Sequence, residues 1–264
     1  MTPFIFDFTG IKPSVEYVTE QEAENIQKEI LTRCPYKVPT VDEIIKLIDT
    51  AYTVDKSTFI TDVFECGALS ISNLVDKTQY NAREEQYKKV ITKYNKKEQI
   101  LMADIFCKIF ALLGSVTYDD GRFNDYLGTL FMQCNMGNKK CGQFFTPYHI
   151  SEFMARIVIT EQEQMLLQQK DEIITINDSC CGAGGMMLAA LDVLKNTYKI
   201  NYTRHCFIEC SDIDIRCVYM TYLQLSLAGV PAIIYHRDSL TMQTWSVWKT
   251  PAFVFQYLRF AKYE

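Results

Sequence analysis

Hydrophobic and polar positions follow two different rhythms along this chain, and the rhythm changes near residue 140. Before that point, apolar residues recur at steps of three and four with lysine and glutamate on the other faces. They do so in four segments, residues 20–32, 41–52, 82–94 and 97–113. This period predicts amphipathic helices. Residues 1–140 are therefore expected to form a helical N-terminal domain.

From residue 141 onward, short β-branched runs alternate with helical patterns. Residues 173–177, 206–210 and 232–235 are typical of strands, and residues 186–195 and 215–227 between them are typical of helices. Strands separated by helices indicate βαβ units and a parallel sheet. The fold class expected for residues 141–264 is therefore α/β.

Composition and charge narrow the class of protein. The chain is 48% hydrophobic and 22% charged, as in an ordinary globular protein, and its net charge is −5. This charge argues against a protein whose whole surface binds nucleic acid. It is compatible with a local basic patch such as Lys139 with Lys140. No run reaches the roughly 18 apolar residues of a membrane span, and the N-terminus lacks the basic start of a secretory signal. We expect a cytoplasmic protein without membrane association.

Ten cysteines raise the question of metal or disulfide chemistry. The sequence contains no CxxC pair, and Cys180 and Cys181 are adjacent. Structural zinc sites usually draw on short ligand pairs in loops, so a zinc site is the less favoured alternative. Reduced, mostly buried thiols and no bound metal are expected.

The sharpest local motif is DSCCGAGG at residues 178–185, between an expected strand and an expected helix. Glycines there permit positive φ angles and let a ligand approach the backbone, while the helix start offers unpaired N–H groups. The acidic residue ahead of the glycines suits a cationic ligand better than a pyrophosphate. The alternative is a tight connection without a ligand. The candidate binding residues are Asp178, Cys180, Gly182, Ala183, Gly184 and Gly185.

Acidic residues also follow the next two expected strands. Asp212, in ECSDID, lies where a Rossmann-type site binds ribose hydroxyls, and Asp238, in HRDSL, is placed to accept a hydrogen bond from an adenine amino group. Their neighbours Ile213 and Ser239 join the candidate site. The alternatives are that Asp212 or Asp214 caps the following helix and that Asp238 is a turn residue. Together with Asp178, these acids predict a line of carboxylates along one edge of the sheet.

A further motif, GQFFTP at residues 142–147, precedes an amphipathic helix. The apolar face of that helix consists of Ile150, Phe153, Met154, Ile157 and Val158. Thr146 as N-cap and Pro147 as first helical residue explain the helix start. They do not explain the preceding residues. Gln143, Phe144 and Phe145 are expected to close over an adenosine ring or a methionine tail.

Together the motifs GQFFTP, DSCCGAGG, ECSDID and RDSL resemble, in order and spacing, those of N-6 adenine DNA methyltransferases of the type I restriction-modification subunit kind. The resemblance spans residues 120–240. It implies a Rossmann-like core that depends on S-adenosylmethionine (SAM), behind an N-terminal helical domain. It also implies that SAM is held by Phe144, Phe145, Thr146, Asp178, Gly182 and Gly184, its ribose by Asp212 and its adenine by Asp238.

The catalytic motif of that family, [Asn/Asp/Ser]-Pro-Pro-[Tyr/Phe], is absent. The nearest match is Thr250-Pro251-Ala252-Phe253, after an expected strand at 244–249. By resemblance, the Thr250 side chain and the Pro251 carbonyl would accept hydrogen bonds from the target amino group, and Phe253 would stack on a flipped adenine. Thr250 offers a hydroxyl where the family has an amide or carboxylate, and Ala252 replaces a stiffening proline, so the motif is interpreted as degenerate.

The chain runs only eleven residues past Phe253, which predicts a truncated methyltransferase sheet. Its open edge is expected to be covered by the helical domain, a second copy or another protein. Three functions stay open. The first is SAM-dependent N-6 methylation of adenine in DNA, alone or with a partner subunit, as in restriction-modification. The second is an inactive SAM-binding relative acting through protein or DNA contacts, for example against restriction or defence. The third is SAM-dependent methylation of a substrate other than DNA.

Overall fold

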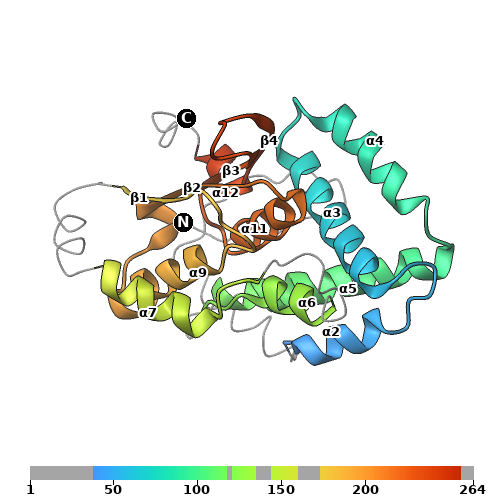
Figure 1. Ribbon diagram of the computed structural model, residues 1–264, viewed down its shortest axis with the longest axis horizontal. Helices are drawn as coiled ribbons and strands as arrows, with labels where there is room; N and C mark the ends of the chain where they lie inside the picture. Colours follow the sequence, from blue (N-terminus) through green and yellow to red (C-terminus); the bar gives the residue numbers. More distant parts are fainter. Residues whose placement is uncertain (1–37, 118–120, 135–143, 160–172, 257–264) are drawn as a thin grey trace, which may run out of the picture. The chain divides into compact units, whose positions relative to one another are not determined.

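The computed structural model describes residues 38–117, 121–134, 144–159 and 173–256 (Figure 1). The elements it contains belong to one compact unit, Pro39–Glu264. The predicted helix at 20–32 lies outside the described residues.

The described part of the chain before residue 135 contains five α-helices: α2 (Val41–Ile48), α3 (Lys56–Val75), α4 (Tyr80–Ile91), α5 (Lys96–Gly114) and α6 (Tyr126–Cys134). Side-chain caps mark three of the starts. Thr40 forms a capping box with Glu43 at α2, Asp55 caps α3 and Asn95 caps α5. The helical character predicted for this half is confirmed for the described residues, although α2 ends four residues before the predicted limit.

The twenty-residue helix α3 has no counterpart among the predicted elements. Its central residues are buried on several sides, including Phe59, Ile60, Val63 and Phe64, because α4, α5, α6 and α11 all pack around it. A helix surrounded in this way lacks the polar face that makes an amphipathic period visible. Its absence from the prediction follows from its central position.

The sheet has four strands, β1 (Ile174–Asp178), β2 (Cys206–Asp212), β3 (Ala232–Arg237) and β4 (Thr244–Lys249), in the order β1-β2-β3-β4. β1, β2 and β3 are parallel, which confirms the predicted parallel sheet and α/β class. β4 runs antiparallel to β3. The six-residue connection between them is too short for the crossover that a parallel neighbour needs.

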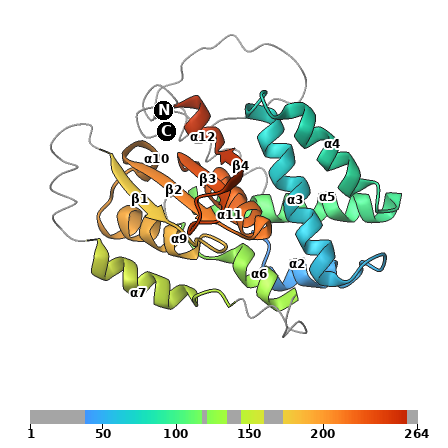
Figure 2. The ribbon, with the colours of Figure 1, turned by 45° about the horizontal axis from the view of Figure 1, so that its top comes forward.

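Helices cover both faces of the sheet (Figures 1 and 2). α9 (Gly185–Asp192), which continues into the π-helical turn η2 (Val193–Thr197), and α11 (Ile215–Leu227) cover one face. There Ile208 and Ile234 join the main core. On the other face Phe207 and Ile233 pack against Phe253 of α12 (Pro251–Phe255). The short α10 (Tyr202–His205) leads into β2.

The main core is continuous from the N-terminal helices to the sheet. Ile44 of α2, Ile105 of α5, Leu223 of α11 and Ile234 of β3 belong to one buried cluster. The predicted domain boundary near residue 140 lies in a part of the chain outside the described residues and stays a prediction.

By length and composition α5, with the short 3-10 turn η1 (Ser115–Thr117), would also pass for a membrane-spanning helix. The same pattern is typical of core helices, and Ile105 and Ile109 of α5 are fully buried in this unit.

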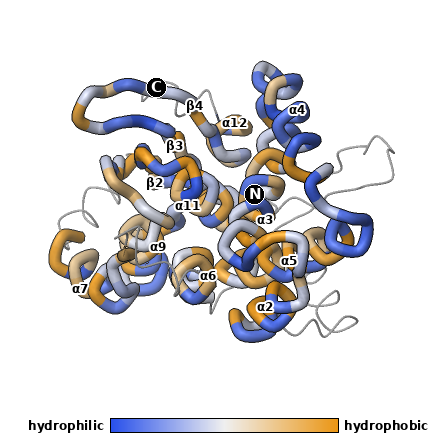
Figure 3. The backbone as a smooth tube through the Cα atoms, turned by 45° about the vertical axis from the view of Figure 1, so that its right-hand side comes forward, coloured by the Kyte–Doolittle hydropathy of each residue, from blue (hydrophilic) through white to orange (hydrophobic). Residues whose placement is uncertain are grey.

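Helix α7 (Tyr148–Val158) turns its apolar face away from the core. Ser151 and Ala155 are buried on the side that packs against α9, whereas Phe153 is 62% exposed and Ile157 is 61% exposed. Figure 3 shows hydrophobic stretches on this peripheral helix. The small side chains of Ser151 and Ala155 allow close approach to α9, which leaves the larger apolar residues outside.

Candidate site at the carboxyl ends of the strands

The carboxyl ends of β1, β2 and β3 meet at one edge of the sheet, because the three strands are parallel. Asp178 ends β1, Asp212 ends β2 and Asp238 directly follows β3. A hydrogen bond connects the segments that follow β1 and β3, since Ser239 Oγ donates to Ser179 O at 2.5 Å. The structure therefore brings the three predicted acidic positions to a single edge.

The glycine motif forms a tight turn between β1 and α9. Gly182 and Gly184 have φ angles of 56° and 93°, in the left-handed region where side chains are disfavoured. Gly184 N donates to Cys181 O at 2.8 Å and closes the turn. A Cβ on Gly182 would lie 3.1 Å from the ring of Phe145. The positive φ angles expected from the sequence are present.

Asp212 faces this turn and is only 8% exposed. Its Oδ2 accepts a hydrogen bond from Gly182 N at 2.9 Å, and its Oδ1 accepts one from Asp214 N at 2.8 Å. Burial raises the pKa of the Asp212 carboxyl, and the two backbone hydrogen bonds oppose that rise. Asp214 caps α11 through Arg216 N. Asp214 is therefore the acid that caps the helix, and ribose binding by Asp212 stays a prediction.

The other two acids organise their own turns. Asp178 Oδ1 accepts a hydrogen bond from Cys180 N at 3.0 Å. Asp238 Oδ1 accepts one from Leu240 N at 2.9 Å and one from Thr241 N at 3.3 Å, and these hydrogen bonds lower the pKa of Asp238. For Asp238 the observed contacts match the turn-residue alternative.

Among the described residues of the GQFFTP motif, Phe145 contacts the glycine turn. Phe145 packs against Gly182 and lies 5.6 Å from Phe131, ring centre to ring centre, whereas Phe144 is 83% exposed. Gln143 lies outside the described residues. The predicted N-cap is wrong by one residue. Pro147 occupies that position with extended backbone, α7 begins at Tyr148, and Thr146 is exposed without a capping role.

The remaining predicted binding residues differ in accessibility. Ala183 and Gly185 are buried, Cys180 is exposed, and Ser239 is partly exposed. Ile213 is 64% exposed beside Asp212 and offers apolar surface at the strand end.

The segment Thr250-Pro251-Ala252-Phe253 lies elsewhere, which corrects its assignment to the target base. Because β4 is antiparallel, its last residue Lys249 pairs with Ile233 near the start of β3, so α12 begins at the edge opposite to the acids. Thr250 is fully buried and caps α12. Pro251 is the first residue of α12, and Phe253 is buried 5.8 Å from Phe207, ring centre to ring centre.

Sequence reasoning missed the polar residues that support the glycine turn from α11 and β2. Thr221 Oγ1 donates to Gly182 O at 2.9 Å, and Gln224 Nε2 donates to Ala183 O at 2.7 Å. Cys181 N donates to Ser211 O at 3.0 Å. Polar residues three apart on the buried side of a predicted helix were the available signal for Thr221 and Gln224.

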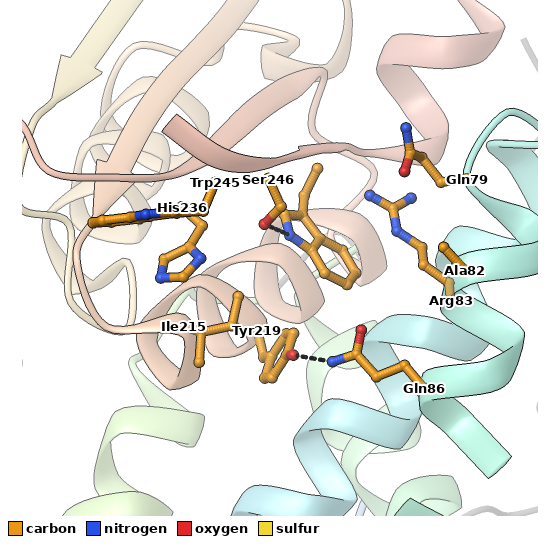
Figure 4. Close-up of a pocket in the computed structure, with 10 residues that line it drawn as sticks. Gln79, Ala82, Arg83, Gln86, Ile215, Tyr219, His236, Trp245 and Ser246 are labelled. Carbon is orange, nitrogen blue, oxygen red and sulfur yellow. Dashed lines mark hydrogen bonds between the residues drawn. The ribbon is translucent and has the colours of Figure 1, made fainter. Parts of the chain in front are cut away.

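A cavity of about 250 Å³ lies beside this edge, between α4, α11 and the β3–β4 hairpin (Figure 4). Its walls include Tyr219, His236, Trp245 and Gln86. His236 Nε2 lies 3.1 Å from the carbonyl oxygen of Ile213, which links the wall to the end of β2. The three acids do not line this cavity, so it is a neighbour of the strand-end site and not the site itself.

The cysteines described by the structure are free thiols. Burial raises the pKa of Cys206 to about 12, which disfavours the thiolate. Within the described ranges, no cluster of three His, Cys, Asp or Glu side chains is placed to hold a metal ion.

Comparison with known proteins adds a family to this geometry. A sequence model described as N-6 DNA Methylase matches residues 118–261, more than half of the chain. The type I restriction enzyme MpnII methylase subunit of Mycoplasma pneumoniae is 28% identical over 123 residues. That alignment covers 46% of this chain and 20% of the relative.

Two solved structures are also similar. The methyltransferase subunit of a type I restriction-modification system from Streptococcus thermophilus gives a TM-score of 0.39 at 18% identity, covering 84% of this chain and 44% of that one. A protein from Listeria monocytogenes, described as a class I S-adenosylmethionine-dependent methyltransferase, gives 0.36 at 15% identity, covering 71% and 55%. These scores are low, and the fold described above rests on the observed strands and helices.

Proposed function

Since the chain belongs to the N-6 DNA methylase family, we propose that its strand-end site binds S-adenosylmethionine and that the protein serves the N-6 methylation of adenine in DNA. One observation carries the cofactor assignment. The buried carboxylate of Asp212 is fixed on the N–H of Gly182, inside a turn whose glycines have left-handed backbone. The family match includes this whole region.

The residues present suit the chemistry of this cofactor. Each oxygen of Asp212 accepts one backbone N–H, and a carboxylate has further lone pairs to accept ribose hydroxyls. Ile213 offers exposed apolar surface for an adenine ring, and Asp178 places a second carboxylate beside the turn. When bound, SAM supplies an activated methyl group on a sulfonium. The role of the chain's own residues is to bind and orient it.

A second candidate function is SAM binding without methyl transfer, with the protein acting through DNA or protein contacts. The position of Thr250 and Phe253 favours it, because both are buried at the sheet edge opposite to Asp212. In this function the site has a regulatory or structural role, such as interference with restriction.

Partners are part of the same proposal. The M. pneumoniae and S. thermophilus relatives are both named as subunits, which supports action on DNA together with another subunit. Among the described strands β1 pairs on one side only, with β2, so its free side is the proposed place for a protein partner or a second copy. We also propose a cytoplasmic location, as befits a protein that acts on DNA.

Calorimetric titration with SAM tests the cofactor site. We expect the wild type to bind, Asp212→Asn to bind at least tenfold more weakly and Asp214→Asn, the matched control two residues away, to bind like the wild type. Absence of SAM binding by the wild type would overturn the cofactor assignment.

Incubation of DNA with tritiated SAM then separates the functions. Label in adenine supports N-6 methylation. Tight SAM binding without transfer to DNA, both alone and with a type I methylase partner subunit, supports the second function. Transfer to protein or RNA instead of DNA would overturn the assigned substrate class.

A further inference from the structure

A buried carboxyl group lies against the glycine turn and was not part of the predicted site. Asp125 precedes α6 and is 6% exposed, and Gln224 in the last turn of α11 is 1% exposed. The two side chains are in direct contact, because Gln224 Nε2 donates to Asp125 Oδ1 at 2.9 Å. A buried carboxyl is costly unless it is hydrogen-bonded, so this arrangement calls for an explanation.

The side-chain amide of Gln224 connects three separate segments. Its Nε2 also donates to Ala183 O in the glycine turn at 2.7 Å, and its Oε1 accepts a hydrogen bond from Leu127 N at 3.4 Å. Asp125 Oδ1 accepts a second hydrogen bond from Gly128 N at 2.9 Å. The start of α6, the last turn of α11 and the glycine turn are therefore joined at one side-chain amide.

The packing around Asp125 shows that the carboxyl position is built in. A Cβ on Gly128 would clash with Asp125 Oδ2, and a Cβ on Gly185 would lie 3.1 Å from the same atom. Gly185 is the first residue of α9, where the free N–H groups of a helix favour negative charge. Glycine at both positions leaves the room that the carboxyl occupies.

Helix α11 holds two successive carbonyls of the turn. Thr221 Oγ1 donates to Gly182 O, and Gln224 Nε2 donates to Ala183 O. Residues three apart lie on the same face of a helix, so both side chains reach the turn together. Gly182 N donates to Asp212. The turn is thus held between α11 and the carboxylate proposed to bind ribose.

We infer that Thr221 and Gln224, the latter oriented by Asp125, are positioning residues that set the conformation of the glycine turn and thereby the affinity for the cofactor. The inference rests on the proposed function. It assigns a role to the buried carboxyl of Asp125 at the start of α6, whose position the strand-end site did not explain. The binding of two backbone carbonyls by one helix leaves the turn prearranged, so a ligand does not have to order it.

Gln99 provides a matched control. Its Nε2 donates to two backbone carbonyls, Ile91 O and Tyr94 O, in the helical part of the chain. Gln99→Met and Gln224→Met therefore both remove donation from a side-chain amide to a backbone carbonyl. Gln224→Met also removes the hydrogen bonds with Asp125 and Leu127. Only Gln224→Met removes such a donation from the turn.

The test compares Gln224→Met, Thr221→Val and Gln99→Met with the full wild-type chain. Calorimetry gives the dissociation constant for SAM, and hydrogen–deuterium exchange reports on residues 180–185. We expect Gln224→Met and Thr221→Val each to weaken SAM binding about five- to tenfold and to speed exchange in the turn, because each removes one hydrogen bond to a carbonyl of the turn. Gln99→Met is expected to bind within about twofold of the wild type, with unchanged exchange in the turn.

Unchanged affinity and exchange in both α11 variants would overturn the inference, as would an equal loss in Gln99→Met. If Gln224→Met does not fold, Thr221→Val decides. If the wild type fails to bind SAM, the proposed function fails. The exchange comparison still shows whether α11 holds the turn, because it requires no ligand.

Discussion

Replacement of Thr250 by valine separates a structural from a catalytic role for that residue. Its hydroxyl donates to Val230 O at 2.7 Å and accepts from Ala232 N at 2.9 Å and from Phe253 N at 3.4 Å. Valine has the same shape but leaves the buried Ala232 N–H without this partner, at a cost of about 1–3 kcal/mol. Loss of the α12 cap adds about 1 kcal/mol.

We therefore expect Thr250→Val to lower the free energy of unfolding by about 2–4 kcal/mol, or the Tm by roughly 4–16 °C for a unit of this length. Urea unfolding with an unchanged m-value and scanning calorimetry measure it. Thr250→Ser keeps the hydroxyl and is expected to cost about 1 kcal/mol or less. Thr40→Val, at an exposed cap, is expected to cost about 1 kcal/mol.

The reasoning is refuted if Thr250→Val stays within about 0.5 kcal/mol of the wild type, since the hydroxyl would then hold nothing in place. If that stable variant also loses a methyl transfer that the wild type performs, the assignment of Thr250 to the target base is restored.

Two further predictions concern charged groups. Burial raises the pKa of Asp212, and ribose hydroxyls donate to its ionised form, so SAM affinity should fall as the pH drops through that raised pKa. Calorimetric titrations of Asp212→Asn should show no such pH dependence. An identical pH profile in the variant and the wild type would contradict the prediction. Arg83 pairs with Asp76, donates to Val247 O and stacks 4.2 Å from the ring centre of Trp248. Arg83→Met should therefore lower the free energy of unfolding, measured with urea, by about 3–5 kcal/mol. A loss below about 1 kcal/mol would show that these contacts are weak.

Much of the site was predictable because its signals are local. The alternation of β-branched runs and helical periods indicated β1, β2 and β3 and their parallel arrangement, and parallel strands necessarily bring their carboxyl ends to one edge. The glycines at 182 and 184 indicated left-handed backbone, and Asp212 was predicted at the carboxyl end of the second strand, where the structure has it beside Gly182.

The supporting residues were harder to find. Gln224 and Asp125 are ninety-nine positions apart, and nothing in either local pattern shows that they meet. The sequence marks each as a polar residue, and only the packing of α6, α9 and α11 brings the two side chains into contact beside the glycine turn.

The chain alone settles what depends on neighbouring residues: the helical and strand periods, the turn at the glycines and the acid after each parallel strand. Tertiary structure decided that Asp125 and Gln224 meet beside the glycine turn and that the apolar face of α7 lies outward. Period and turn chemistry are properties of a short segment. The meeting of two such side chains and the burial of a helix face depend on contacts between segments distant in sequence, which no local pattern contains.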